Sequence, residues 1–310
     1  MPPLPLDAKI YVAGHAGLVG SAVWRHLESL GHRNLVGMRS SELDLTDRAA
    51  AFAFFDKQRP DYVIDAAARV GGIAANVRFP ADMISENLRI QVNLLDAAHE
   101  FDVRRLLFLG SSCIYPKHAP QPIPESALLS GALEPSNDAY AIAKIAGVLQ
   151  VQALRRQFGR SFISAMPTNL YGPGDNFDLE TSHVLPALIR RFHEARLRGD
   201  SEVTVWGTGS PRREFLHVDD LAAACLLLLE RYDDDEPVNI GTGTDLSIKD
   251  LAELVAEVVG FAGGIRFDPG RPDGTPRKLL DTGRIAALGW RPRIGLRDGI
   301  AATYEWYVNR

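Results

Sequence analysis

The chain opens with a strand, a glycine turn and a helix, and this order restricts the possible fold more than any other feature. Residues 9–13 read as a short apolar strand, and residues 21–30 have the periodicity of an amphipathic helix. Glycines spaced GxxGxxG between them let backbone amides approach a pyrophosphate at the helix N-terminus. A turn kept only for helix packing is the alternative. The segment predicts a dinucleotide site formed by Gly14, Gly17, Leu18, Val19 and Gly20.

Strands and helices then alternate along the chain. Further strands are predicted at residues 34–38, 62–66, 106–109 and 162–166, with helices at 47–58, 81–100 and 139–158. This alternation predicts a parallel α/β sheet covered by helices on both faces.

Prolines and glycines crowd residues 167–174, and we expect the chain to enter a second domain there. Residues 184–198 read as a helix, and residues 237–240 as a strand that rejoins the large sheet. A helix at 247–259 begins with Ser247 and Asp250, which are spaced as a capping box. We predict one domain from residues 1–171 and 214–244, and a second from 172–213 and 245–310.

Composition excludes several classes of protein. Of 310 residues, 46% are hydrophobic and 24% charged, as in folded globular domains. A net charge of −5 without a long basic run argues against nucleic acid as a partner. Cys113 and Cys225 lack the spacing of a disulfide framework or a zinc site, so we expect no metal. The sequence lacks a leader pattern and a bilayer-length apolar run, which predicts a cytoplasmic protein without a membrane partner.

The end of the second predicted strand bears on the cofactor. NAD-binding sites place a carboxylate there for the ribose 2′-hydroxyl, whereas this chain has Gly37, Met38 and Arg39. A guanidinium can pair with a 2′-phosphate, so Arg39 favours NADP over NAD. A solvated surface arginine is the alternative. Asp44 and Leu45 are predicted to meet the adenine.

A candidate catalytic group follows the fourth predicted strand. Tyr140 and Lys144 are spaced i and i+4, on one face of a predicted helix. We expect the ammonium to lower the pKa of the phenol, so that the pair can pass a proton at neutral pH. Ser111 directly follows an apolar strand, where open α/β sheets bind ligands. Ser111 and Tyr140 are therefore expected to reach the same reacting oxygen.

These motifs resemble the extended short-chain dehydrogenase/reductase family, which modifies nucleotide-activated sugars. The resemblance runs from Lys9 to about Tyr307 and is carried by residues 70–73, 109–116, 140–147, 166–173, 213–220 and 272–281. It implies a Rossmann-type doubly wound parallel sheet with a smaller, discontinuous α/β substrate domain. It also implies NADPH as cofactor, a GDP-sugar as substrate and a homodimer formed through the helices at 81–100 and 139–158.

The resemblance further implies a bifunctional reaction in which GDP-4-keto-6-deoxy-D-mannose is inverted at C3 and C5 and then reduced at C4. Protons beside a carbonyl are acidic because their removal gives an enolate, and inversion needs a base and an acid on opposite faces. Cys113 matches the family's base and His183 its acid. Ser111, Tyr140 and Lys144 would polarise the C4 oxygen in both stages.

The remaining site residues follow from the same resemblance. Cofactor contacts are implied for Tyr140, Lys144, Ala67, Pro167, Asn169, Leu170 and His183. Contacts to the GDP-sugar are implied for Ser111, Ser112, Arg191, Arg213 and Lys278. Asn169 is expected to line the sugar pocket because it follows a sheet strand, and Trp206 to flank the guanine, with a core tryptophan as the alternative. The chain departs from some relatives at Ala16, where they carry an arginine that helps to hold a 2′-phosphate.

Other functions stay open at this point. A sugar-nucleotide 4,6-dehydratase would carry a carboxylate close after the catalytic hydroxyl, and residues 112–114 supply none. A 4-epimerase would not need Cys113 together with His183. An enzyme acting on a related GDP-keto-deoxysugar, as in colitose formation, is hardly separable by residues. A nicotinamide-binding regulator would not need an intact Ser111, Tyr140 and Lys144.

Overall fold

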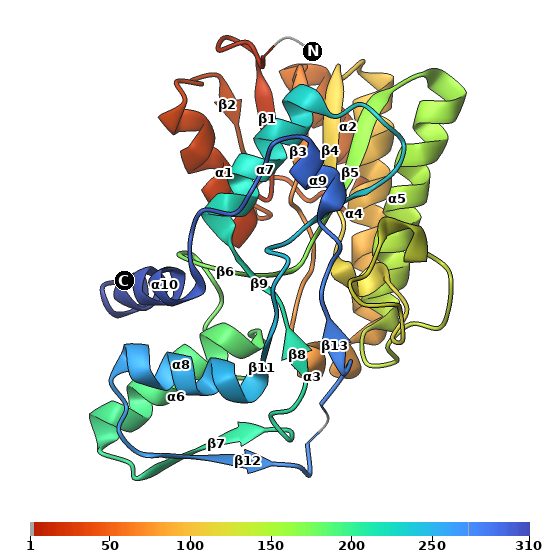
Figure 1. The fold of residues 1–310 in the computed structure, drawn as a ribbon. Helices are drawn as coiled ribbons and strands as arrows, with labels where there is room; N and C mark the ends of the chain where they lie inside the picture. Colours follow the sequence, from red (N-terminus) through yellow and green to blue (C-terminus); the bar gives the residue numbers. More distant parts are fainter. Residues whose placement is uncertain (1–2, 272) are drawn as a thin grey trace.

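The computed structural model describes residues 3–271 and 273–310, and its centre is a six-stranded sheet (Figure 1). The strand order is β2-β1-β3-β4-β5-β10, and each neighbouring pair is parallel. The bounds are β1 (Ile10–Ala13), β2 (Leu35–Val36), β3 (Tyr62–Asp65), β4 (Arg105–Leu109), β5 (Ser161–Pro167) and β10 (Val238–Ile240). The strand order reverses at β1, and ligands of open α/β sheets bind beyond the carboxyl ends of the strands at such a point.

Alternation along the strands divides the side chains between two cores. Ile10 and Val12 face one core, whereas Tyr11 and Ala13 face the other. The first core is covered by α1 (Leu18–Ser29) and α7 (Val218–Arg231). The second is covered by α2 (Arg48–Gln58), α4 (Pro80–Glu100) and α5 (Asp138–Phe158). The predicted parallel α/β sheet with helices on both faces is confirmed.

A third core forms the smaller lobe, which lies below the large sheet in Figure 1. Its elements are α6 (Val184–Arg198), β7 (Glu202–Trp206), α8 (Ile248–Val259), β12 (Gly264–Asp268) and α10 (Leu296–Val308). The predicted capping box of α8 is confirmed, because the Ser247 hydroxyl accepts from the Asp250 amide at 3.0 Å and the Asp250 carboxylate accepts from the Ser247 amide at 3.3 Å.

Short strands lie between the large sheet and the smaller lobe (Figure 1). β6 (Asn169–Tyr171) pairs with β9 (Phe215–His217). A three-stranded sheet contains β11 (Leu246–Ser247), β8 (Arg212–Arg213) and β13 (Arg277–Lys278). Sequence periodicity did not predict β8, β11, β12, β13, α10 or the short helices α3 (Ile73–Arg78) and α9 (Gly283–Ala287).

The chain crosses between the two lobes more than once. β10 rejoins the large sheet as predicted, beside β5. Ile285 and Trp290, in a segment that we assigned to the second domain, pack in the first core of the large sheet. The domain boundaries stay a prediction. Three residues of the predicted domains, Met1, Pro2 and Pro272, lie outside the described residues.

A buried polar network fixes the loop that follows β4. The Tyr115 hydroxyl donates to Asn239 Oδ1 at 2.6 Å, and Asn239 Nδ2 donates to the Ile123 carbonyl at 2.9 Å. The Asn239 amide donates to Glu125 Oε1 at 3.0 Å. Because the loop is bound to β10 in this way, the residues just after β4 have a fixed position.

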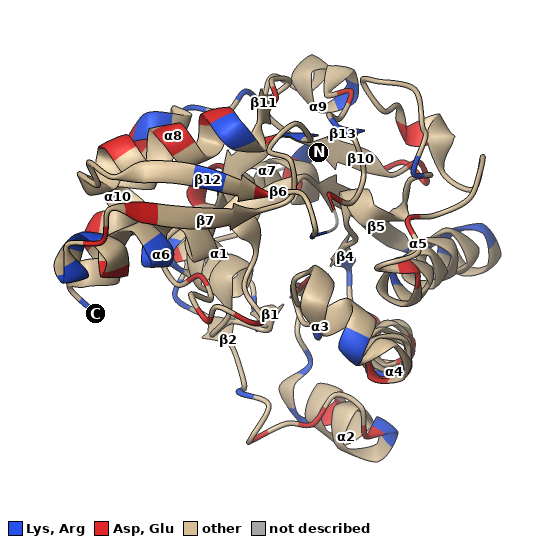
Figure 2. Cartoon of the chain, turned by 90° about the horizontal axis from the view of Figure 1, so that it is seen from below, with Lys and Arg blue, Asp and Glu red and all other residues tan. Residues whose placement is uncertain are grey.

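The two helices of the smaller lobe differ in charge: α6 carries four arginines and one glutamate, whereas α8 carries one lysine and three acidic residues (Figure 2). In the part of the chain that the structure describes, every helix is too short or too polar to cross a membrane.

Candidate active site

The glycine turn leaves the first helix open to a phosphate. Gly14 has a φ of +73°, and a Cβ on it would lie 2.8 Å from the Ala66 carbonyl oxygen. A Cβ on Gly20 would lie 2.1 Å from the Gly14 carbonyl oxygen. Leu18 and Val19 form the first turn of α1, which among the described residues has neither a capping side chain nor an acidic residue. The free amides and the glycine cradle fit the pyrophosphate of a dinucleotide.

His15, which sequence analysis overlooked, ties the glycine turn to the end of β2. A Cβ on Gly37 would lie 2.4 Å from its ring, which also packs against Trp24 with ring centroids 5.5 Å apart. Arg39 follows in an exposed position, with its backbone amide donating to Glu42 Oε2 at 2.9 Å. Arg39 therefore lies in the exposed segment after the carboxyl end of β2, and its contact to a 2′-phosphate stays a prediction.

The next turn holds the two predicted adenine contacts. The Asp44 carboxylate accepts from the Thr46 amide at 2.9 Å and from its hydroxyl at 2.7 Å. The carbonyl of Leu45 accepts from Asn93 Nδ2 at 2.9 Å. Asp44 is thus engaged within its own turn, whereas Leu45 is anchored to α4.

Asp65, a buried carboxylate that sequence analysis also overlooked, ends β3. It is fully buried; Oδ1 accepts from the Ala67 amide at 3.1 Å, and Oδ2 has no hydrogen-bond partner among the described residues. Burial raises the pKa of Asp65 to about 6, although the charge of Lys144 and the Ala67 hydrogen bond oppose this rise. The available signal was an acidic residue at the end of an apolar strand.

Lys144 faces Asp65 rather than the phenol. Its ammonium donates to the Leu109 carbonyl at 2.9 Å and lies 4.8 Å from the Phe108 ring centroid. Burial lowers the pKa of Lys144, and the charge of Asp65 opposes this. The expectation that Lys144 lowers the pKa of Tyr140 is wrong for this structure. Burial raises the pKa of Tyr140, a Cys113 thiolate would raise it further, and only the hydrogen bond with Ser111 lowers it.

Ser111, Cys113 and Tyr140 come together at the carboxyl end of β4. The Ser111 hydroxyl accepts from the Cys113 amide at 3.2 Å, and it lies close enough to the Cys113 thiol and the Tyr140 phenol to lower the pKa of each. Ser112, between them in sequence, is buried and starts a short 3₁₀ helix. One hydroxyl thus contacts both the thiol and the phenol.

Two cations and an amide converge on the thiol of Cys113. Lys278 Nζ lies 3.5 Å from Sγ, and Asn137 Nδ2 donates to Sγ at 3.2 Å. Burial disfavours the thiolate, but the charge of Lys278, the hydrogen bonds from Ser111 and Lys278, and the charge of Arg213 outweigh it. The pKa of Cys113 therefore lies below its ordinary value.

His183 precedes α6 as its N-cap residue and shares the influence of Lys278. His183 is exposed to solvent, but the protein packed around its ring partly desolvates the imidazole and lowers its pKa, and the charge of Lys278 lowers it further. The loop before it packs on Gly72, whose amide donates to the Thr181 carbonyl at 2.9 Å. A Cβ on Gly72 would lie 2.6 Å from the Ser182 carbonyl oxygen, so this glycine lets the His183 loop approach.

The other predicted contacts are divided between two places. Pro167 ends β5; Asn169 and Leu170 follow on β6, where Asn169 Nδ2 donates to the Glu214 carbonyl at 2.8 Å.

Arg191 and Trp206 form a separate group, with the guanidinium 5.2 Å from the indole centroid and both residues lining one surface pocket. Sequence analysis did not single out Arg271, whose guanidinium carbon lies 4.8 Å from the centroid of the same indole. Within residues 3–271 and 273–310, no three His, Cys, Asp or Glu side chains gather as a metal site would require.

Comparison with known proteins identifies relatives over nearly the whole chain. The NAD dependent epimerase/dehydratase family matches residues 10–241. GDP-L-fucose synthase 1 of Arabidopsis thaliana is 62% identical over 302 residues, which cover 97% of this chain and 94% of that protein. GDP-L-colitose synthase of Yersinia pseudotuberculosis is 35% identical over 303 residues, 97% and 98% of the two chains. A solved GDP-L-fucose synthetase from Naegleria fowleri bound to NADP is 30% identical, with a TM-score of 0.91 and coverage of 99% and 96%.

Replacing Asp65 with Asn tests the buried pair. The change removes the negative charge that supports the Lys144 ammonium, so the pKa of Lys144 should fall further below its ordinary value. Lys144 is a predicted cofactor contact, so NADPH affinity should decrease as its ammonium loses its proton with rising pH. In Asp65→Asn this decrease should begin at a lower pH than in the unmodified protein. Fluorescence titration across neutral and alkaline pH measures this. Asp56→Asn, on the exposed surface of α2, is the charge-matched control, and identical profiles for all three proteins would refute the coupling.

Proposed function

The chain belongs to the NAD dependent epimerase/dehydratase family, and we propose that it works as a GDP-L-fucose synthase. It inverts GDP-4-keto-6-deoxy-D-mannose at C3 and C5 and reduces C4 with NADPH. The observation that carries the proposal is the meeting of Ser111, Cys113 and Tyr140 beside Lys278. An identity of 62% with the Arabidopsis GDP-L-fucose synthase, against 35% with the Yersinia GDP-L-colitose synthase, favours the fucose substrate over the colitose alternative.

In the epimerisation stage, Cys113 acts as the base. The cations beside it favour the thiolate, which takes a proton from the carbon next to the C4 carbonyl. His183 gives a proton to the opposite face of that carbon; its lowered pKa makes the imidazolium a stronger acid but leaves most of the imidazole neutral at pH 7, so the reacting form is the protonated minority. The Ser111 and Tyr140 hydroxyls donate hydrogen bonds to the enolate oxygen at C4.

In the reduction stage, the same hydroxyls serve the C4 oxygen again. When bound, NADPH supplies the hydride. Tyr140 donates its proton to the developing alkoxide, and the raised pKa of this phenol keeps it protonated until then. Lys144 and Asp65 hold a buried charge pair behind it. One hydrogen-bonding site therefore supports both reactions.

Cations from the smaller lobe hold the GDP group in this proposal. Arg213 and Lys278 come from adjacent strands and carry charge toward the diphosphate. Arg191 is half-buried beside Trp206, where a guanine can pack against the exposed indole.

The first prediction concerns the two stages. Purified protein with GDP-4-keto-6-deoxy-D-mannose should consume NADPH and release GDP-L-fucose, followed by absorbance and by identification of the sugar. Cys113→Ser should keep NADPH binding but slow solvent exchange of the C3 and C5 protons, because the serine hydroxyl that replaces the thiol hardly ionises at neutral pH and is therefore a poor base. Tyr140→Phe should chiefly slow reduction, by about 10²-fold or more. A folded, NADPH-binding protein that forms no product would contradict the proposed function.

The second prediction concerns the 2′-phosphate. Arg39→Ala should weaken NADPH binding about tenfold or more, because a charge-assisted hydrogen bond is lost, and should leave NADH binding nearly unchanged. Arg33→Ala, which removes another exposed arginine near β2, is the matched control. Titration of both cofactors measures the effect, and equal weakening of the two would exclude the role of Arg39.

The third prediction concerns assembly, because we also propose a homodimer formed by α4 and α5. Exposed apolar residues on these two packed helices support it: Val92 is 37% exposed, Ile142 44% and Leu149 40%. Light scattering should give a dimer for the unmodified protein and a monomer for Leu149→Glu. Leu197→Glu, at an exposed leucine of α6, should remain dimeric. A monomeric unmodified protein would rule out this assembly.

The cysteines bear on the compartment. Cys113 and Cys225 are both free thiols, as a reducing compartment allows, and we propose that the protein acts in the cytoplasm.

A further inference from the structure

Two adjacent strands of the small sheet each carry two consecutive cations. β8 contains Arg212 and Arg213, and β13 contains Arg277 and Lys278. The parallel register places Arg212 beside Arg277 and Arg213 beside Lys278. Because successive residues of a strand point to opposite faces, each face of this ladder carries two neighbouring positive charges. Such neighbours repel each other unless a negative group lies between them.

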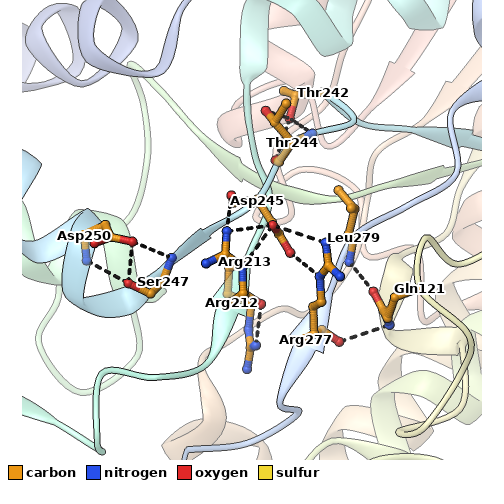
Figure 3. Close-up of polar contacts among 10 residues, drawn as sticks. All are labelled: Gln121, Arg212, Arg213, Thr242, Thr244, Asp245, Ser247, Asp250, Arg277 and Leu279. Atoms are coloured by element: carbon orange, nitrogen blue, oxygen red, sulfur yellow. Dashed lines mark hydrogen bonds and ion pairs between the residues drawn. The ribbon is translucent and has the colours of Figure 1, made fainter.

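Asp245 supplies that negative group on one face (Figure 3). Its Oδ1 accepts from Arg212 Nε at 3.1 Å and Nη2 at 3.0 Å, and its Oδ2 accepts from Arg277 Nε at 2.5 Å. Arg212 Nη2 also donates to the Asp245 carbonyl at 2.8 Å. The carboxylate is 5% exposed, whereas the two arginine side chains are 44% and 43% exposed, so the buried acceptor holds both guanidinium groups by charge-assisted hydrogen bonds. Asp245 thus joins β8 to β13 through their side chains.

The other face of the ladder carries charge toward Cys113. Lys278 contacts the thiol at 3.5 Å, and the charge of Arg213 also acts on it. Gln121 holds the backbone on both sides of Lys278, because its Nε2 donates to the Arg277 carbonyl at 3.2 Å and its Oε1 accepts from the Leu279 amide at 2.9 Å (Figure 3). The position of the Lys278 ammonium therefore depends on how β13 is held, by Gln121 on one side and against β8 on the other.

We propose that Asp245 is a positioning residue for the epimerisation stage: it clamps Arg212 to Arg277 on one face of the ladder and so holds Lys278 and Arg213 beside the thiol on the other. The inference rests on the proposed function, in which Cys113 is the base. It extends that function to a residue that lies on the opposite face from the reacting atoms.

Charge and position predict opposite effects of removing the carboxylate. The charged and titratable groups facing Cys113 are Lys278, Arg213 and Tyr140, and the carboxylates of Glu134 and Asp273 act on Arg213. If Asp245 acted only through its charge, its loss would leave the surroundings more positive and lower the pKa of Cys113. If it acts as a clamp, its loss releases β13, Lys278 moves from the thiol, and the pKa rises.

The test follows the pH dependence of Cys113 alkylation by iodoacetamide, read by peptide mass spectrometry. Asp245→Asn should move the profile to higher pH and slow alkylation at neutral pH about tenfold, equivalent to a pKa rise of about one unit. Asp250→Asn is the matched control, because it removes a nearby carboxylate that also acts on Arg212 but joins no strands. A profile that is unchanged in Asp245→Asn, or moved to lower pH, would overturn the proposal.

A second variant separates geometry from charge. Arg277→Lys keeps the positive charge but removes the Nε contact to Asp245, so it should move the profile in the same direction; an unchanged profile would count against the clamp. It also decides the question if Asp245→Asn does not fold, as circular dichroism would show. Formation of GDP-L-fucose is measured on the same samples. An inactive unmodified protein with the expected alkylation shifts would reject the proposed function but keep the clamp.

Discussion

The hydroxyl of Ser111 joins three parts of the site: it accepts from the backbone amide of Cys113 at 3.2 Å and acts to lower the pKa of both the Cys113 thiol and the Tyr140 phenol. These contacts form because β4 ends at this point and the 3₁₀ turn after it brings Cys113 back toward Ser111. The loop beyond is fixed to β10 through Tyr115 and Asn239. The thiol and the phenol therefore meet one oxygen-binding position, from which the proposed epimerisation and reduction both proceed.

Around this position, the protein controls protonation by arranging buried charges in pairs. Lys278 and Arg213 favour the Cys113 thiolate, whereas burial keeps Tyr140 protonated. The pKa values of the two groups thus shift in opposite directions although one serine acts on both. The charge of Asp65 supports the Lys144 ammonium, and Asp245 forms direct ion pairs with Arg212 and Arg277. Burying a charge without a partner costs several kcal/mol, so each cation at the site needs its own carboxylate or hydrogen bonds.

Local patterns in the sequence predicted the large sheet, because buried parallel strands and long amphipathic helices have clear periods. The same holds for the capping box of Ser247 and Asp250, whose partners are three residues apart. The short strands β8, β11 and β13 were missed, since two residues carry no period. The pairing of Asp65 with Lys144 and of Asp245 with Arg277 depends on tertiary contacts. Spacing suggested a Tyr140 with a lowered pKa, but Lys144 binds the Leu109 carbonyl instead.

The central claim is that one hydrogen-bonding site serves both reactions, and Ser111→Ala tests it most directly. The measurement follows, in one sample in deuterated water, the incorporation of solvent deuterium at C3 and C5 and the rate of NADPH oxidation. If Ser111 stabilises the enolate and later the alkoxide, both rates should fall by about 10²-fold or more. If only one rate falls while the other is unchanged in a folded protein that still binds NADPH, the two reactions do not share this site.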